Sequence, residues 1–511
     1  MVNREGQPIE IELKFILSPD AARRLARLPE FRPPTASAPV TRRLVSTYFD
    51  TADCDLARSG LSLRVRSDGE KRVQTVKSRS TNGAAAASRG EWEQPLTSDE
   101  PDLALALASG TPIANALPAG AETQLRPVAV SDIVRTTRLI QIDESAVEAA
   151  LDVGSIEADG RRAPVRELEL ELREGNEAAL YRLALALHAS VPLRIEAESK
   201  AARGYRLRYG GSPQAIKAED VELEPNVAGA DALRLIVANA LGHLLANRAA
   251  ALAGEAEGIH QTRIAIRRLR SAMQLFRPLL APHATGLFDA ELRTLGRVIG
   301  EARDWDVFLS KVLPDAAKRS ANGGLIEMLR EPAEKRAAAA HVESERALNE
   351  PSLTSLVLGL AAWSEDRQAL GDERLQRQLK DLAADLLDRL LKKAEKRGRH
   401  IHANSPAAGL HPLRKSLKKL RYGVEFLAAL YPGKAIKAYV KGLKRVLKAQ
   451  GAVNDAAVAM RLAEELTGSQ HIELAPPVGA LAQAAEAGSA EARRKFRKPW
   501  DALKGDTPFW R

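Results

Sequence analysis

Several residue types are scarce in this chain, and each scarcity narrows what the protein can be. Its 511 residues include one cysteine, Cys54, which excludes an internal disulfide and any metal site built from several cysteines. This usage fits the reducing cytoplasm. We find no uninterrupted run of about 18 apolar residues and no apolar leader near the first residue, so we expect a soluble, cytoplasmic protein with no membrane partner. Few aromatic residues stand beside its charged motifs, which weighs against a pocket that stacks nucleobases.

Acidic residues are scarce in the second half of the chain, where basic residues are in excess. Residues 1–225 hold 30 Lys and Arg against 34 Asp and Glu, whereas residues 226–511 hold 46 against 32. The imbalance is steepest at residues 411–450, which carry eleven Lys or Arg and a single acidic residue, Glu425. Such a local field gathers phosphate groups. The length of 511 residues suggests two to four domains.

Alternation of polar and apolar residues predicts strands throughout the first ~210 residues. The clearest stretches are 9–15, 61–66, 72–77, 89–93 and 167–173, with helical segments near 19–28 and 176–190. An ordinary half-buried strand has mixed Ser, Thr and Lys at its polar positions, but here these positions are almost wholly carboxylate or basic side chains. If such strands close into a barrel with these faces inward, they line a tunnel. Its carboxylates could hold a hard divalent cation while its basic groups bind phosphate oxygens.

An ordered set of motifs gives this stretch a family resemblance. Its members are Glu10-x-Glu12-x-Lys14, Tyr48-Phe49-Asp50-Thr51, Leu63-Arg64-Val65-Arg66, Thr75-x-Lys77, the Glu167-x-Glu169-x-Glu171 ladder, and Ser199-Lys200 followed by Gly204-Tyr205. Over roughly residues 7–208 the set resembles the CYTH domain of the triphosphate tunnel metalloenzymes. The resemblance implies an eight-stranded antiparallel β tunnel barrel with flanking helices, at residues 1–210. Such a barrel binds a triphosphate inside and cleaves or rearranges it with Mg²⁺ or Mn²⁺.

The resemblance also implies roles for individual residues. The phosphate-binding side chains would be Lys14, Arg64, Arg66, Lys77 and Lys200, joined by the less firmly matching pair Arg135 and Arg138. The metal or the attacking water would be held by Glu10, Glu12, Glu169 and Glu171, with Glu167, Glu91, Glu93 and Asp152 as further candidates. The catalytic set would combine Glu10, Glu12, Lys14, Glu169 and Glu171. Which two of the three ladder glutamates contact the metal directly stays open.

Helical periodicity replaces the alternation over about residues 229–505, after a linker at 211–228 that contains glycine and proline. Here the string His260-x-x-Arg263-x-x-x-Arg267-Arg268-Leu269-Arg270 recurs 151 residues later as His411-x-x-Arg414-x-x-x-Lys418-Lys419-Leu420-Arg421. At the same offset, Gly300-x-x-Arg303-Asp304 recurs as Gly451-x-x-Asn454-Asp455. In each string the histidine and three cations share one helix face, which attracts a polyanion. The repeat indicates an internal duplication, with copies near 229–375 and 376–505.

These repeated residues resemble the conserved-histidine α-helical (CHAD) domain. The resemblance implies two four-helix bundles related by a pseudo-twofold axis, with a basic surface that binds inorganic polyphosphate. The residues that would bind it are His260, Arg263, Arg267, Arg270, His411, Arg414, Lys418 and Arg421. In the second copy lysines replace two arginines, and lysine lacks the bidentate fork, so that copy would grip phosphate less geometrically. We interpret the histidines as hydrogen-bond donors to phosphate, because no further carboxylate or cysteine neighbours suggest a metal site.

The order of the two domains resembles that of bacterial inorganic triphosphatases. We therefore expect hydrolysis of tripolyphosphate to pyrophosphate and phosphate, by a cytoplasmic protein that can associate with polyphosphate granules. The same tunnel could instead serve a nucleoside or thiamine triphosphatase or an adenylate cyclase. A non-catalytic polyphosphate-binding scaffold is a rival from another class, which the intact glutamate motifs oppose. Nucleic acid is not an expected partner, because the basic stripes lack interleaved aromatic residues.

Overall fold

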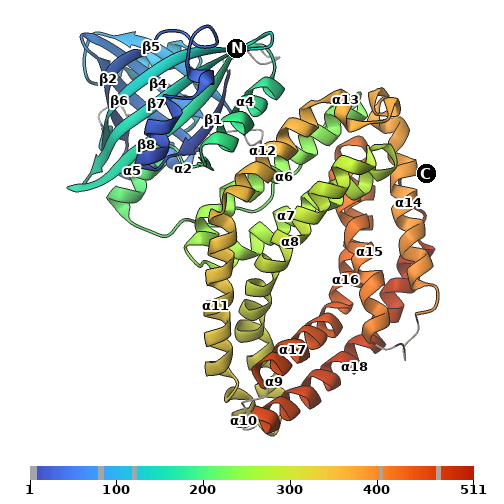
Figure 1. The fold of residues 1–511 in the computed structure, drawn as a ribbon. Coiled ribbons are helices and arrows are strands. Elements are labelled where there is room, and N and C mark those ends of the chain that lie inside the picture. The colour runs from blue at the N-terminus through green and yellow to red at the C-terminus, as the bar shows by residue number, and fades with distance from the viewer. Residues whose placement is uncertain (1–8, 79–85, 118–123, 402–404, 406, 468–473) are drawn as a thin grey trace. The chain divides into compact units, whose positions relative to one another are not determined.

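The computed structural model describes residues 9–78, 86–117, 124–401, 405, 407–467 and 474–511. The chain forms two compact units (Figure 1). The first comprises Met1–Pro213 together with Asn349–Asp366, and the second comprises Gln214–Leu348 together with Arg367–Arg511. The chain therefore passes from one unit to the other three times, and neither unit is a single continuous stretch of sequence.

Eight antiparallel strands of the first unit form a closed barrel. They are β1 (Ile9–Ile16), β2 (Val40–Asp50), β3 (Leu61–Asp68), β4 (Lys71–Ser78), β5 (Ala87–Leu96), β6 (Arg126–Ile142), β7 (Ser145–Ala158) and β8 (Arg161–Glu174). Their order is β5-β4-β3-β2-β6-β7-β8-β1, and β1 also pairs with β5, which closes the sheet. The expected antiparallel barrel is thus confirmed. A two-residue strand, β9 (Arg194–Ile195), adds to β1 and was not predicted.

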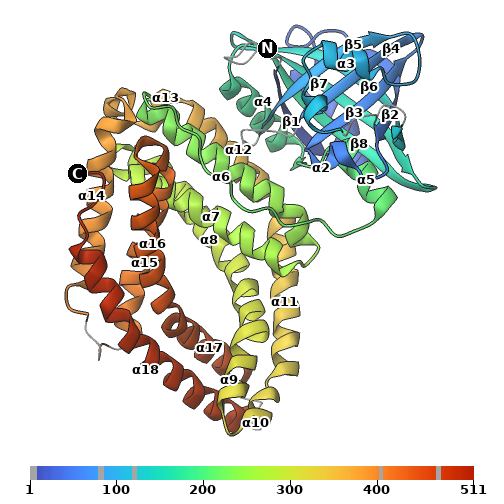
Figure 2. The ribbon, with the colours of Figure 1, turned by 180° about the vertical axis from the view of Figure 1, so that it is seen from behind.

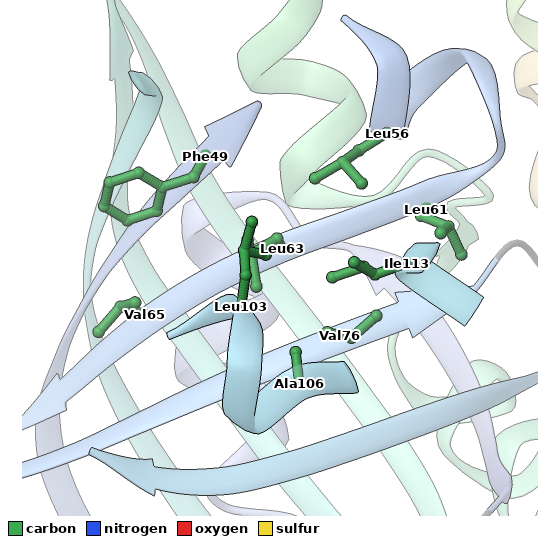
Figure 3. Packing of buried hydrophobic residues seen from close by; sticks show 9 residues of the cluster. All are labelled: Phe49, Leu56, Leu61, Leu63, Val65, Val76, Leu103, Ala106 and Ile113. Atoms are coloured by element: carbon green, nitrogen blue, oxygen red, sulfur yellow. The ribbon is translucent and has the colours of Figure 1, made fainter. Parts of the chain in front are cut away.

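One part of the apolar core of this barrel unit lies outside the barrel. Side chains alternate along a strand, so the charged and apolar residues of β3 point to opposite faces. Leu63 and Val65 lie on the outer face, where they pack with Leu56 of α2 (Asp55–Arg58) and with α3 (Leu103–Ala108), as Figure 3 shows. The arginines between them therefore face the interior. Helices α2 and α3 therefore cover an apolar outer face of β3.

Two helices from distant parts of the sequence cover another side of the barrel. α4 (Glu177–Ser190) lies against β8, and α12 (Pro351–Glu365) packs on α4. The buried residues of α12 include Leu353, Leu356, Val357, Leu358, Leu360 and Trp363. His188 of α4 accepts a hydrogen bond from the Leu193 amide at Nδ1 (3.0 Å) and places Nε2 3.0 Å from the Pro351 carbonyl. Because Nδ1 accepts, Nε2 carries the proton and joins α12 to the barrel unit.

One end of the barrel interior is apolar and is covered by α5 (Lys200–Tyr209). Ala201 of α5 packs with inward residues of four strands, namely Leu44, Ile133, Ile156 and Val165. Gly204 allows this close approach, since a Cβ there would lie 2.5 Å from the Cβ of Ala129. The charged part of the interior is therefore bounded on this side by a packed helix. A further α-helix in the described part of this unit is α1 (Pro19–Leu25).

The second unit, the helical unit, is all-α, which confirms its expected class. At the 151-residue offset, each long helix of the first copy has a counterpart in the second. Helix α6 (Gly229–Leu252) corresponds to α14 (Leu379–Gly398), and α7 (Ala256–Phe276) corresponds to α15 (Ala407–Phe426). Helix α8 (Pro282–Val307) corresponds to α16 (Gly433–Ala449) with α17 (Gly451–Thr467), and α11 (Arg330–Asn349) corresponds to α18 (Ala475–Gly505). Shorter helices are α9 (Leu313–Arg319), α10 (Gly323–Glu327) and α13 (Arg367–Leu370). The second copy thus divides at Gln450, where the first continues as one helix. α7 and α15, which carry the repeated string, pack against each other (Figure 2).

Among the described helices, α6 alone is long and apolar enough to cross a membrane by length and composition. However, 61% of its most apolar window is buried inside the protein. The core helix of a globular unit passes the same test, so this finding is weak evidence for a membrane span.

Candidate functional sites

Strand register brings the charged positions together on the inner face of the barrel. Cross-strand neighbours are Lys14 with Glu169, Glu12 with Glu171, Arg135 with Asp152, Arg64 with Thr75, and Lys77 with Glu91. Directly opposed residues of antiparallel strands have Cβ atoms about 5 Å apart, so these side chains form one band of mixed charge. Lys77 Nζ also lies 2.7 Å from Glu10 Oε2. The predicted tunnel residues thus come from strands far apart in the sequence.

Arg138 is the predicted phosphate-binding residue that this band does not contain. It lies three positions from Arg135, and an odd number of steps along a strand places two side chains on opposite faces. Its guanidinium donates to the Ser37 carbonyl at 3.2 Å. The spacing of the two arginines suggested a pair, but the period of a strand separates them.

Arg64 and Arg66 form the anion-attracting part of the interior. Arg64 Nη2 lies 3.6 Å from Glu91 Oε1, and its buried Nε has no hydrogen-bond partner among the described residues. Arg66 Nε donates to Ser46 Oγ at 3.3 Å. Burial, with the neighbouring Arg64 and Arg135, lowers the pKa of Arg66 to about 10. Crowded guanidinium groups with an unused donor are suited to bind an anion.

Asp152, Glu167 and Glu169 form an acidic cluster that is already neutralised. One carboxylate oxygen from each lies within 4.8 Å of the others, close enough to share a metal ion. However, Lys200 Nζ lies 2.8 Å from Asp152 and 2.7 Å from each glutamate. Arg135 also pairs with Asp152 and Glu169. Burial would raise the pKa of Glu169, but Lys200 and Arg135 lower it well below 4.5.

Glu171 lies in a part of the band with surplus negative charge. Burial and the nearby Glu10 raise its pKa to about 7, although Arg173 opposes the shift and lies 2.5 Å away. A divalent cation would relieve this surplus, and carboxylate oxygens are the ligands that Mg²⁺ and Mn²⁺ prefer. Glu171 and its neighbours Glu10 and Glu12 are therefore candidates for holding an added cation, although among the described residues only Asp152, Glu167 and Glu169 bring three carboxylate oxygens within 4.8 Å of one another.

Tyr48 is an interior residue that the motif contained but to which no role was given. It lies opposite Arg64 on neighbouring strands and is buried. Burial raises its pKa, but Arg64, Lys200 and Arg66 outweigh this effect and lower it below 10. Its hydroxyl therefore stands among the cations that would meet a phosphate. Alternation along β2 could have identified it, since Tyr48 and Ser46 share the inner face.

A second charged site lies between α7 and α15 of the helical unit. We call it the cationic cluster, and its members are Arg263, Arg267, Arg414, Lys418 and Arg421. Burial, followed by the other four members, lowers the pKa of Lys418 to about 7. The Nε atoms of Arg267, Arg414 and Arg421 are buried without a hydrogen-bond partner among the described residues. The two copies of the repeated string thus converge on one cationic site.

The remaining predicted residues of the string lie around this cluster or apart from it. His260 borders it. Its Nδ1 is buried without a hydrogen-bond partner in the part of the chain that the structure describes, and burial and Arg303 lower its pKa. His411 is exposed and hydrogen-bonds with Asn454, the residue that replaces the arginine of the first copy. Arg270 instead donates to Asp289 of α8 at 2.9 Å. The structure therefore does not bring Arg270 into the cluster, although its counterpart Arg421 belongs to it.

The repeated aspartates join the two copies. Asp304 accepts from Arg263 at 2.6 Å and also pairs with Arg461 of the second copy at 3.2 Å. Asp455 pairs with Lys311 of the first copy at 3.2 Å. Each aspartate thus contacts a cation of the other copy. This role was missed because no sequence pattern links residues so far apart.

Comparison with known proteins relates both sites to described families. Residues 8–205 match the model of the CYTH domain, and residues 235–464 match that of the CHAD domain. An inorganic triphosphatase from Haemophilus influenzae is 32% identical over 202 residues, which are 39% of this chain and 54% of that protein. The chain thus spans about half the length of this curated relative.

Two solved structures match parts of this chain. The CHAD domain from the plant Ricinus communis matches with a TM-score of 0.51 and 29% identity, over 58% of this chain and 98% of that chain. A putative adenylyl cyclase from Hippeastrum, described as having a dominant triphosphatase activity, matches with a TM-score of 0.30 and 19% identity, over 39% of this chain and 96% of that chain.

Proposed function

We propose, from the premise that the chain carries a CYTH domain followed by a CHAD domain, that its barrel hydrolyses a triphosphate with a divalent metal ion. The observation that carries this proposal is the separation of charge inside the barrel. Arg66 has a pKa lowered to about 10 by burial and neighbouring cations, whereas Glu171 has a pKa raised to about 7 by burial and a neighbouring carboxylate. One region therefore favours an added anion and the other an added cation. A metal–triphosphate complex supplies both.

Glu10, Glu12 and Glu171 are the residues that would hold Mg²⁺ or Mn²⁺. When bound, such an ion neutralises phosphate charge and polarises the phosphoryl group under attack. Lys77, which lies 2.7 Å from Glu10 Oε2, connects these carboxylates to the phosphate-binding side of the band.

The chain's own residues would position the substrate and the attacking water. Arg64 and Arg66 would bind the phosphate oxygens, and Tyr48 could donate its hydroxyl to one of them. Lys200 and Arg135 hold Glu169 in place through ion pairs, so that its carboxylate can orient the water in line with the bond that breaks. Most of the rate would come from positioning and from stabilisation of developing charge.

Inorganic triphosphate is the substrate that this interior suits best. Among the inward positions of the described strands, Tyr48 is the only aromatic residue, and it is buried. A nucleobase or a thiamine ring would therefore find no stacking platform there. The relative from Haemophilus influenzae is itself named an inorganic triphosphatase.

Phosphate release from tripolyphosphate, ATP and thiamine triphosphate tests this proposal. We expect turnover of tripolyphosphate to exceed that of the other two, to require Mg²⁺ or Mn²⁺, and to stop with EDTA. Arg64→Ala should reduce kcat/KM, and Arg138→Ala, which removes an arginine outside the band, is the matched control. Equal loss in both variants, or metal-independent turnover, would contradict the assignment.

For the helical unit we propose binding of inorganic polyphosphate at the cationic cluster, without hydrolysis. The supporting observation is the set of buried guanidinium Nε atoms at Arg267, Arg414 and Arg421, which have no hydrogen-bond partner among the described residues, although Arg421 Nε lies 3.6 Å from Glu425 Oε1. Among described residues, no metal-sized group of three carboxylate, histidine or cysteine ligands lies in this unit. Purified protein should therefore bind long-chain polyphosphate and leave its length unchanged. Such binding would direct the chain to polyphosphate granules.

A further inference from the structure

Helix α16 presents a row of lysines to solvent along its length. The row, which we call the lysine stripe, consists of Lys434, Lys437, Lys441, Lys444 and Lys448, and all five are exposed. Their spacing of three and four residues places them on one face of the helix. The opposite face is buried and consists of Ile436, Tyr439, Leu443, Val446 and Leu447. The apolar residues suffice to pack the helix, so packing does not require the lysines.

The stripe has no internal compensation. Helix α16 contains no acidic residue, and within the described chain none of the five lysines forms an ion pair. Like charges at this spacing repel each other and destabilise a helix. A row that weakens its own helix is expected to serve an external anion.

The internal duplication shows that the fold can be built without the stripe. At the 151-residue offset, the five lysines correspond to His283, Gly286, Ala290, Arg293 and Arg297 of α8. The first copy also places Asp289 and Glu291 on this helix, and Asp289 pairs with Arg293 at 2.6 Å. The same helix in the same repeat is thus charge-balanced in one copy and purely cationic in the other. The stripe is a property of the second copy alone.

The stripe begins beside the cationic cluster. Arg414 of the cluster donates to the carbonyl of Leu447 at 2.6 Å, and Leu447 is followed directly by Lys448. From Lys448 the stripe extends away along α16 to Lys434. Fourteen residues of helix correspond to about 21 Å. The end of the stripe at Lys448 therefore follows directly in the chain on a residue that the cluster contacts.

We propose that the lysine stripe is an extension track for long polyphosphate and lets this protein favour long chains over short ones. The inference rests on the proposed binding of polyphosphate at the cationic cluster. Lysine is a point charge on a flexible stem, and a row of such charges matches an evenly charged line of phosphates. No exposed aromatic or large apolar residue lies on α16, so the stripe offers neither a base-stacking surface nor an anchor for a membrane.

Binding of short and long polyphosphate distinguishes the contribution of the lysine stripe from that of the cationic cluster. Chains of about 10 and about 100 phosphates are compared at fixed ionic strength with the full-length protein. The test variant replaces all five stripe lysines by glutamine, which has a similar helix propensity. The matched control replaces Arg293 and Arg297 of α8 by glutamine. A milder variant, Lys437→Gln with Lys444→Gln, keeps the test valid if the fivefold variant does not fold.

We expect the fivefold variant to bind the long chain at least about tenfold more weakly and the short chain within about twofold of wild type. Its salt dependence for the long chain should also decrease, by about three in the slope of log K against log salt, because fewer counterions are released. The control variant should behave as wild type for both lengths. Arg263→Glu with Arg414→Glu should instead weaken both lengths.

Three results with the stripe variants would overturn the inference. The stripe variants could bind both lengths as tightly as wild type, or lose both lengths equally. They could also lose more affinity for single-stranded DNA of equal charge than for polyphosphate, which would make nucleic acid the ligand of the stripe. If the wild-type protein bound neither length, the proposed function of the cluster would fail first and the inference with it. That pattern is distinct from a selective failure of the stripe.

Discussion

Lys200 in the barrel is buried and Lys418 in the helical unit is half-buried, yet the pKa values of these two lysines shift in opposite directions. Burial disfavours the charge of each. Asp152, Glu167 and Glu169 reverse that effect and raise the pKa of Lys200, whereas Arg267, Arg414 and other cations lower the pKa of Lys418 to about 7. The difference lies in the partners of each lysine. Three carboxylates pair with Lys200, whereas the ion pairs of the cationic cluster reach Arg263 and Arg421 and leave Lys418 among cations.

The largest expected effect follows from removing a barrel carboxylate. Glu169→Ala should lower kcat for tripolyphosphate by at least about 100-fold, the scale of losing one stabiliser of the transition state. Steady-state kinetics at saturating Mg²⁺ measure it, with polyphosphate binding as a second readout that should not change. Glu157→Ala, which removes an exposed glutamate of β7, is the control. Near-normal turnover of Glu169→Ala would show that hydrolysis does not need this carboxylate and would contradict its proposed role in the barrel.

Charge reversal in the cationic cluster should give the next largest effect. Arg263→Glu with Arg414→Glu should weaken long-chain polyphosphate binding by about 30-fold or more at about 150 mM salt, where only close contacts escape screening. Triphosphatase turnover should stay unchanged. Arg270→Glu is the informative control, because Arg270 belongs to the string but pairs with Asp289 outside the cluster. If the double variant bound polyphosphate like wild type, the cationic faces of the repeated string would be ordinary solvated helix faces.

The pH dependence of binding should sharpen the comparison further. The lowered pKa of Lys418, about 7, means that the free protein loses this charge as the pH rises above 7. A bound polyanion favours the charged lysine, so Lys418 takes up a proton on binding above pH 7. Affinity should therefore fall by up to about tenfold per pH unit above pH 7, whereas below pH 7 the neighbouring His260, whose pKa is lowered by burial and by Arg303, is the group that takes up a proton. Lys418→Arg should flatten the profile, because arginine stays charged, while Lys419→Arg should not.

The smallest expected effect concerns the barrel unit without α12. A fragment of residues 1–210 should keep its turnover at 25 °C, because all carboxylates and cations of the band lie within it. Its melting temperature should be about 5–10 °C below that of the same fragment fused to residues 349–366, since the apolar face of α4 loses its cover. Calorimetry of the two fragments measures the difference. Equal melting temperatures would mean that α12 is dispensable to the barrel unit.

Much of the barrel could be predicted from sequence because a strand's period of two is strict. Charged residues at every second position placed Arg64 and Arg66 on one face, and the structure has them inside. Arg138 was misplaced because motif spacing was followed instead of that period. The neutralisation of Glu167 and Glu169 by Lys200 could not be predicted, since it depends on where α5 meets the barrel.

In the helical unit, the sequence shows which residues are repeated but not how they come together. The duplication and the cationic face of each string were visible in the sequence, but their convergence between α7 and α15 depends on helix packing. The string also could not distinguish Arg421, which belongs to the cluster, from Arg270, which turns to Asp289. Helix α12 was unpredictable as part of the barrel unit, because its apolar pattern carries no information about which unit it covers.

That helix has a consequence for how the protein is made. The barrel is encoded first, but the residues that cover α4 lie beyond residue 348, after half of the helical unit. At a synthesis rate of about 5–20 residues per second, the first unit waits on the order of 10 s for its last element. If the barrel folds during synthesis, α4 lacks the cover of α12 for that interval, and its apolar face is then open to a chaperone that binds exposed apolar surface.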